Sequence, residues 1–128
     1  MGGYNMTLTN DVLNTDFVDA VQDRINTDCT YGAIGTGTAE ESASGTALGN
    51  EYLRKARQET TTDATSRTVS LWVGSTQGNG SDVGEVGFFN AASDGSMKVR
   101  HKLASTITKT SDIELWFDVK TTIACTQT

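Results

Sequence analysis

The chain has 128 residues, a net charge of −6 and a pI near 4.6. This acidity argues against nucleic-acid binding, which needs a basic patch, and against docking on anionic membranes, which needs Lys and Arg clusters. Ordinary solubility explains the acidity best, and adaptation to high salt remains a second interpretation. The length suits one domain, which we expect to span residues 1–128.

No run of about 18 apolar residues is present, so we expect no transmembrane helix and no membrane insertion. Residues 1–5 lack the charged and apolar regions of a signal peptide. We therefore expect synthesis in the cytoplasm, with release by lysis if the protein works outside the cell.

Residues 10–26 predict one amphipathic helix that must pack on a sheet. Its apolar residues recur every four positions: Leu13, Phe17, Val21 and Ile25, with Val18 beside them. Asn14 or Thr15 can cap the start of the helix.

From Cys29 onward the pattern changes to strands and turns, over about residues 29–125. Residues 31–37 predict a short strand, and residues 38–49 a loop. Residues 51–62 are ambiguous between a helical turn and an extended segment, and we favour the extended one. Alternating or continuous apolar residues predict four further strands, at 66–74, 83–90, 97–103 and 113–123.

Two local signals are stronger than the rest. Asp94-Gly95 suits a turn with positive φ. In residues 113–123 one face is apolar and the other carries Trp116 and charged residues, which is typical of a half-buried strand.

These elements predict a mainly β protein, a β-sandwich or a jelly-roll-like fold, with one amphipathic N-terminal helix. The chain contains no proline. Its edge strands therefore lack a common blocker, and we expect neighbouring subunits to cover them.

Two cysteines, Cys29 and Cys125, match no zinc or redox motif. A disulfide between them would tie an early segment to the last strand. Two buried thiols are slightly favoured, because the chain is made in a reducing cytosol.

We predict no catalytic site and no cofactor. The one histidine, His101, lies among cationic residues without an orienting partner, so neither a serine nor Cys29 gains a base. Glu40-Glu41 and the helix aspartates Asp16, Asp19 and Asp23 are expected to be solvated. Whether a metal binds stays open, since Asp82, Asp94 and Asp112 lie in loops without a known ligand spacing.

Glu85 differs from the other carboxylates, because it lies within the apolar segment 83–89. A buried carboxylate needs a partner, and three arginines are candidates: Arg54, Arg57 and Arg100. We expect a structural ion pair, and a catalytic acid is the minority interpretation.

Trp72 and Trp116 both fall on the polar face of their strands. An outward-facing tryptophan is covered by its own chain or contacts another molecule. With two of them, contact with another subunit or with a host is a balanced alternative to internal cover.

Four segments together resemble a recurring pattern in small structural proteins of tailed viruses, bacterial and archaeal: residues 31–39, 47–56, 84–97 and 107–115. These proteins are often described as tail-fibre or head-surface proteins. The resemblance covers roughly residues 29–119 and carries over no catalytic residue.

The resemblance implies a virion protein, repeated symmetrically, with copies of itself and other virion proteins as partners. The chain lacks a fibrous repeat and an adhesin domain, which favours a turret or decoration subunit on the head. The alternatives are a tail-fibre or baseplate adhesin that binds a host glycan or surface layer and, least favoured, an enzyme acting on the host envelope.

Overall fold

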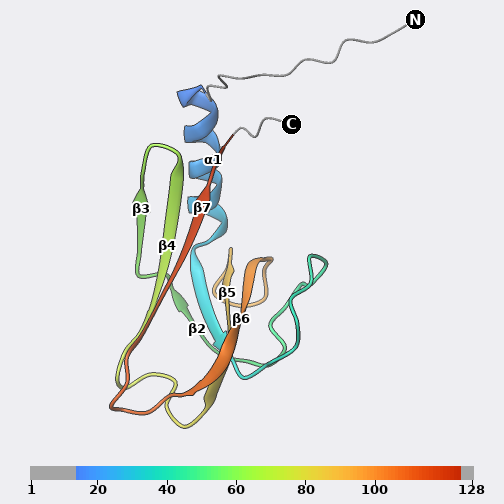
Figure 1. Cartoon of the computed structure of the whole chain (residues 1–128), viewed down its shortest axis with the longest axis vertical. Coiled ribbons are helices and arrows are strands. Elements are labelled where there is room, and N and C mark those ends of the chain that lie inside the picture. The colour runs from blue at the N-terminus through green and yellow to red at the C-terminus, as the bar shows by residue number, and fades with distance from the viewer. Residues whose placement is uncertain (1–13, 125–128) are drawn as a thin grey trace, which may run out of the picture.

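The computed structural model describes residues 14–124, which form one helix and seven strands (Figure 1). The elements follow in this order: α1 (Thr15–Asp28), β1 (Tyr31–Gly35), β2 (Glu51–Ala56), β3 (Glu59–Thr62), β4 (Ser66–Val73), β5 (Asp82–Phe89), β6 (Met97–Thr108) and β7 (Leu115–Thr122). No helix in this part of the chain is long and apolar enough to cross a membrane.

The strands form two antiparallel sheets, a four-stranded sheet in the order β2-β1-β5-β6 and a three-stranded sheet in the order β3-β4-β7. The chain changes sheet three times, after β2, β4 and β6. The predicted fold class is confirmed: the protein is mainly β and sandwich-like, with one N-terminal helix.

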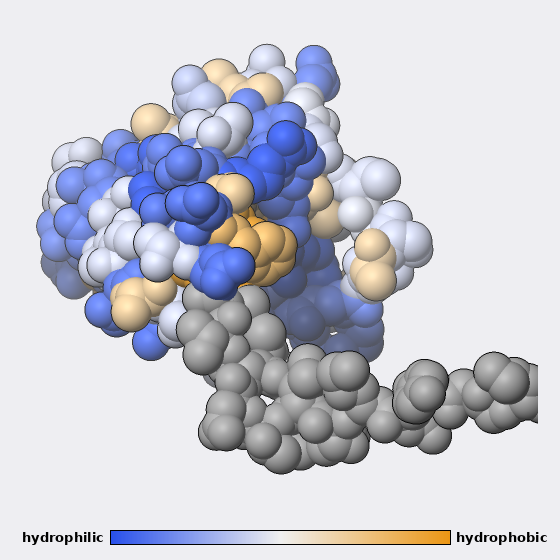
Figure 2. All heavy atoms as spheres, turned by 90° about the horizontal axis from the view of Figure 1, so that it is seen from above, coloured by the Kyte–Doolittle hydropathy of each residue, from blue (hydrophilic) through white to orange (hydrophobic). Residues whose placement is uncertain are grey.

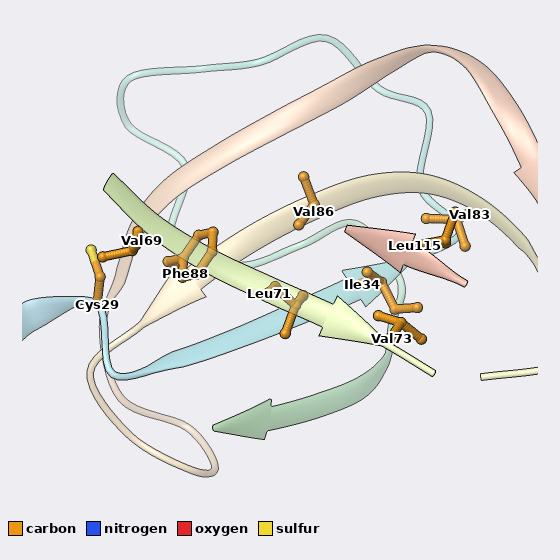
Figure 3. Close-up of a cluster of buried hydrophobic side chains, with 9 residues drawn as sticks. All are labelled: Cys29, Ile34, Val69, Leu71, Val73, Val83, Val86, Phe88 and Leu115. Atoms are coloured by element: carbon orange, nitrogen blue, oxygen red, sulfur yellow. The ribbon is translucent and has the colours of Figure 1, made fainter. Parts of the chain in front are cut away.

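The main core lies between the two sheets, where alternate residues of β4 and β5 point inward (Figure 3). Its members are Cys29, Ile34, Val69, Leu71, Val73, Val83, Val86, Phe88 and Leu115. Most are β-branched or aromatic, the residue types that pack best on a pleated surface. Gly32 lets the sheets approach closely here, because a Cβ at that position would overlap the Leu71 side chain.

Helix α1 leads into β1 and packs against β4. Its buried face is not the whole predicted stripe. Val18 and Gln22 are buried, whereas Phe17 is 55% exposed, so the expected burial of Phe17 is wrong. The physical reason is Gln22, whose amide donates to the carbonyl oxygens of Asp63 and Ser66 and turns this side of the helix toward the β3–β4 hairpin. Leu13 and the predicted start of the helix at residues 10–13 lie outside the described residues.

The loop 36–50 covers the outer face of the four-stranded sheet. Under it a second, smaller cluster forms from Ala33, Leu48 and Phe89, with the Arg54 guanidinium 3.6 Å from the centre of the Phe89 ring. Strand β5 is therefore covered on both faces, by the other sheet and by this loop. This arrangement explains why residues 83–89 are all buried.

The predicted strands are found, with shifted ends. Residues 51–62 are extended, as favoured, but a break after Ala56 divides them between the two sheets. Strand β6 continues to Thr108, five residues beyond the predicted end at 103. Asp94 and Gly95 both have positive φ, at 52° and 68°, as expected for this pair.

Candidate functional site

The Glu85 carboxylate lies fully buried between β5 and the covering loop, and it accepts four hydrogen bonds. Oε2 accepts from the backbone N–H groups of Gly37 and Asn50, each at 2.8 Å. Oε1 accepts from the Gly49 N–H at 2.8 Å and from Arg100 Nε at 3.0 Å. Of the three candidate arginines, the structure places Arg100 against Glu85.

This environment makes Glu85 an anchor for the loop. Burial alone raises the pKa of Glu85, but the hydrogen bonds from Asn50, Gly49, Arg100 and Gly37 outweigh it, so the pKa lies below the ordinary glutamate value. Each oxygen already has two donors, which leaves no position for a substrate proton. A Cβ at Gly37 would overlap the carboxylate, so the loop needs glycine there.

Trp72 and Trp116 lie directly opposite each other on β4 and β7, on the outer face of the three-stranded sheet. Trp116 is 49% exposed, and Trp72 is half-buried. The Lys55 ammonium lies 5.0 Å from the centre of the Trp72 ring. The two residues singled out from the sequence therefore form one pair, of which Trp116 is the accessible member.

Asp118 holds Trp116 in place. Its Oδ1 accepts a hydrogen bond from Trp116 Nε1 at 2.7 Å and another from Ser70 Oγ on the neighbouring strand. No described hydrogen bond uses Oδ2 of Asp118. The outer face of β7 thus presents an oriented indole beside a carboxylate with one free oxygen.

The sandwich is incompletely closed on the side of β6 and β7, which are the outermost strands of their sheets. Several apolar residues there pack on the core yet stay partly exposed, and we call them the open flank: Val99, Leu103, Ile107, Phe117 and Val119. The face of α1 that residues 14–124 leave uncovered adjoins this flank.

A groove of about 490 Å³ lies where α1, β6 and β7 meet. Its lining includes Val21, Ile25 and Val99, with Lys98 and Asp28 at the rim. Seen from the end of the molecule that carries α1, an apolar patch lies among polar side chains (Figure 2). An apolar groove beside strands whose outer edges pair with no other described strand is a surface suited to another protein segment.

Within residues 14–124, the other charged candidate residues for a reactive site are exposed at the surface. His101 is exposed, and its Nδ1 lies 3.3 Å from Glu41 Oε1. Glu40 pairs with Lys102, which lowers the pKa of the Glu40 carboxyl. Among residues 14–124, no three His, Cys, Asp or Glu side chains gather as metal ligands do.

Cys29 is buried in the core, where desolvation is the largest effect raising the pKa of its thiol, ahead of the nearby Asp28. Cys125 lies outside the described residues, as does any pairing between the two.

Lys109 is a structural residue that the sequence did not reveal. It is fully buried, and its ammonium donates to Asn79 Oδ1 at 2.8 Å and to the Thr110 carbonyl at 3.0 Å. These bonds join the turn before β5 to the turn before β7. A lysine between polar turn residues normally indicates a solvated side chain, so no sequence signal pointed to this role.

Comparisons with known proteins add no relative: no protein-family model matches the chain, and no match was found among curated proteins or solved structures.

Replacing Glu85 with glutamine is expected to lower the free energy of unfolding by about 2–4 kcal/mol, because the amide NH2 group would face backbone donors that it cannot accept from. Urea unfolding followed by circular dichroism measures this. The exposed Glu59 on β3 gives the control, and Glu59→Gln should change stability by less than about 0.5 kcal/mol. Equal effects of the two variants would contradict the anchor role.

The same carboxylate predicts a pH dependence. Because the pKa of Glu85 is lower in the folded state, its stabilisation is present above the unfolded value of about 4.3 and is lost as the pH falls through the folded value. The stability difference between the native chain and Glu85→Gln should therefore shrink below about pH 4.3. A stability difference that stays constant from about pH 6 to about pH 3 would refute this linkage.

The tryptophan pair predicts unequal solvent access. In Trp72→Phe, the remaining Trp116 should be quenched strongly by acrylamide, whereas in Trp116→Phe the remaining Trp72 should be quenched less. Stern–Volmer slopes of the two variants test the order, and a steeper slope for Trp72 would contradict the geometry.

Proposed function

We propose that this chain is a structural protein of a tailed virus particle, a turret or decoration subunit on the head surface that assembles as a symmetric homo-oligomer. The main support for self-assembly is the open flank, where apolar residues of β6 and β7 remain partly exposed. A second subunit that covers them would complete the sandwich.

The helix supports the same proposal. Phe17 is more than half exposed, and Val21 lines the groove, although both belong to one apolar stripe. A lone apolar residue on a surface needs no explanation. An exposed stripe that continues into a groove and along two strand edges is typical of an interface between subunits.

The viral assignment rests on the motif series. Three of the four segments meet around one carboxylate: residues 31–39 supply Gly37, residues 47–56 supply Gly49 and Asn50, and residues 84–97 supply Glu85. These three segments therefore form one connected structural unit. This supports interpreting the four segments together, as one sequence pattern of a family. It identifies no catalytic group, and we propose a role without catalysis.

An adhesin on the tail is the second candidate, favoured by Trp116. An oriented indole beside a carboxylate suits a sugar ring, which stacks its C–H face on the indole and donates a hydroxyl to the oxygen. The partners in this case are a host-surface glycan or surface layer. The acidic charge favours neither nucleic acid nor anionic membrane as a partner of the chain.

Antibody labelling of intact particles from a lysate tests the location. We expect gold label on the heads, in a symmetric arrangement, and release of the protein as an oligomer on mild disruption. Label on the tails would replace the turret with the adhesin, and particles without label would refute the virion role.

A glycan array with the Trp116→Ala variant as control tests the adhesin. Binding that is lost in Trp116→Ala but kept in the matched surface variant Glu59→Gln would favour the adhesin. No binding by the native chain would leave the decoration subunit as the favoured role.

A further inference from the structure

We infer that two copies of this chain join through the free edges of their β7 strands, antiparallel about a two-fold axis at Val119, with Asp118 of each copy opposite Lys120 of the partner subunit. This pairing rests on the proposed self-assembly and is independent of where on a particle the protein lies.

The backbone of β7 is arranged for such pairing. The Ile123 N–H donates to the Thr65 carbonyl, so the odd-numbered residues of β7 exchange hydrogen bonds with β4. Because neighbouring residues of a strand bond in opposite directions, the even-numbered residues direct their N–H and C=O groups away from β4. These residues are Trp116, Asp118, Lys120 and Thr122. In the described part of the chain, β4 is the only strand that pairs with β7.

The charges select one register. Two β7 edges bond only when even-numbered residues face each other, which any two-fold axis centred on a residue allows. Among these axes, those at Asp118, Val119 and Lys120 set the two charged residues against each other or against themselves. The first choice opposes two Asp118 carboxylates, and the last opposes two Lys120 ammonium groups. The axis at Val119 instead places Asp118 against Lys120 twice, and opposite charges across strands are the stabilising combination.

Both charged groups have capacity for this contact. Lys120 is exposed, and no ion pair within residues 14–124 involves it. Asp118 uses only Oδ1 in its bonds to Trp116 and Ser70, so Oδ2 remains for the partner's Lys120. The intramolecular bonds fix the carboxylate in position and do not compete with the contact.

The other edges are less suited. On β6, the Lys102 N–H donates to the Glu41 carboxylate at 2.7 Å, and Lys102 Nζ binds Glu40, so the loop places charge on that edge at Lys102. Strand β3 has four residues. Beside β2, Tyr52 binds the Gly78 carbonyl of the turn that follows β4. Side-chain cover and short length are common protections of sheet edges. Strand β7 has eight residues, and among residues 14–124 no side chain bonds to its backbone.

The same axis covers the open flank. A two-fold axis normal to the three-stranded sheet joins two such sheets into one and keeps both inner faces on the same side. The inner-face residues Phe117 and Val119 of one copy then lie beside the inner face of the partner subunit's three-stranded sheet.

Charge reversal with complementation tests the register. Lys120→Glu opposes Glu and Asp, and Asp118→Lys opposes two Lys, so each variant alone should raise the dimer dissociation constant by about tenfold or more. An equal mixture restores both attractive pairs and should return to dimers. Sedimentation velocity and native mass spectrometry distinguish the species, since one chain has a mass of 13.6 kDa.

Two further variants separate the contact from the fold. Lys120→Pro removes an N–H directed away from β4 and should abolish dimers while the circular dichroism spectrum stays native. Thr61→Glu adds a negative charge to the exposed surface of β3 and should leave the dimer unchanged. Because the Lys120 side chain makes no hydrogen bond or ion pair with residues 14–124, these variants decide the question even if Asp118→Lys unfolds.

A native chain that stays monomeric, or dimers that persist in both Lys120→Glu and Lys120→Pro, would overturn the inference. Failure of the mixture to recover dimers, with both variants folded, would overturn the register. If the antibody label lies on particles but these variants keep the mass of a dimer, only the β7 pairing is refuted. If the variants lose the dimer as expected but particles carry no antibody label, only the proposed virion role is refuted.

Discussion

The fold depends on how one buried carboxylate is satisfied. Glu85 occupies a position in β5 where an apolar residue would be expected, and its charge requires four donors that no single strand can supply. The covering loop supplies three backbone N–H groups and β6 supplies Arg100. Meeting this requirement draws the loop over the four-stranded sheet and gives β5 its second covered face. A surface ion pair could not do this, because exposed pairs contribute little.

The sequence predicted the structure correctly where local features decide it, namely the alternation of side chains along a strand and the φ angles of a turn. The alternation in residues 113–123 and the positive φ of Asp94 and Gly95 follow from local chemistry, and both were predicted. The sequence limited the ion-pair partner of Glu85 to three arginines. It could not identify which of the three pairs with Glu85, since that depends on how β5 and β6 align. Periodicity predicted that α1 is amphipathic. It could not predict that Gln22 would be buried while Phe17 is exposed, because that follows from two carbonyl groups in the β3–β4 hairpin.

The connections between the two sheets explain why the sandwich is closed on one side and open on the other. The connection from β2 to β3 is two residues long and holds that side together. On the other side the strands are joined by a longer turn, in which Lys109 is fixed by Asn79 and Thr110. The helix fills part of the space above β1 but leaves Val99 and its neighbours partly exposed. The surface proposed for assembly is thus a direct result of the topology, and no special binding motif is needed to explain it.

The pairing of β4 with β7 also governs the order in which the chain can fold. The whole β5–β6 hairpin lies between these two strands in the sequence, so a chain emerging from the ribosome exposes the edge of β4 that pairs with β7 until β7 has been made. Pairings between distant segments form slowly, and exposed strand edges invite aggregation during the wait. Where many copies are synthesised close together, β4 of one nascent chain can meet β7 of another before its own arrives. Strand exchange between copies is then a consequence of high expression, and less frequent initiation of synthesis or a chaperone that shields β4 would favour the correctly closed subunit.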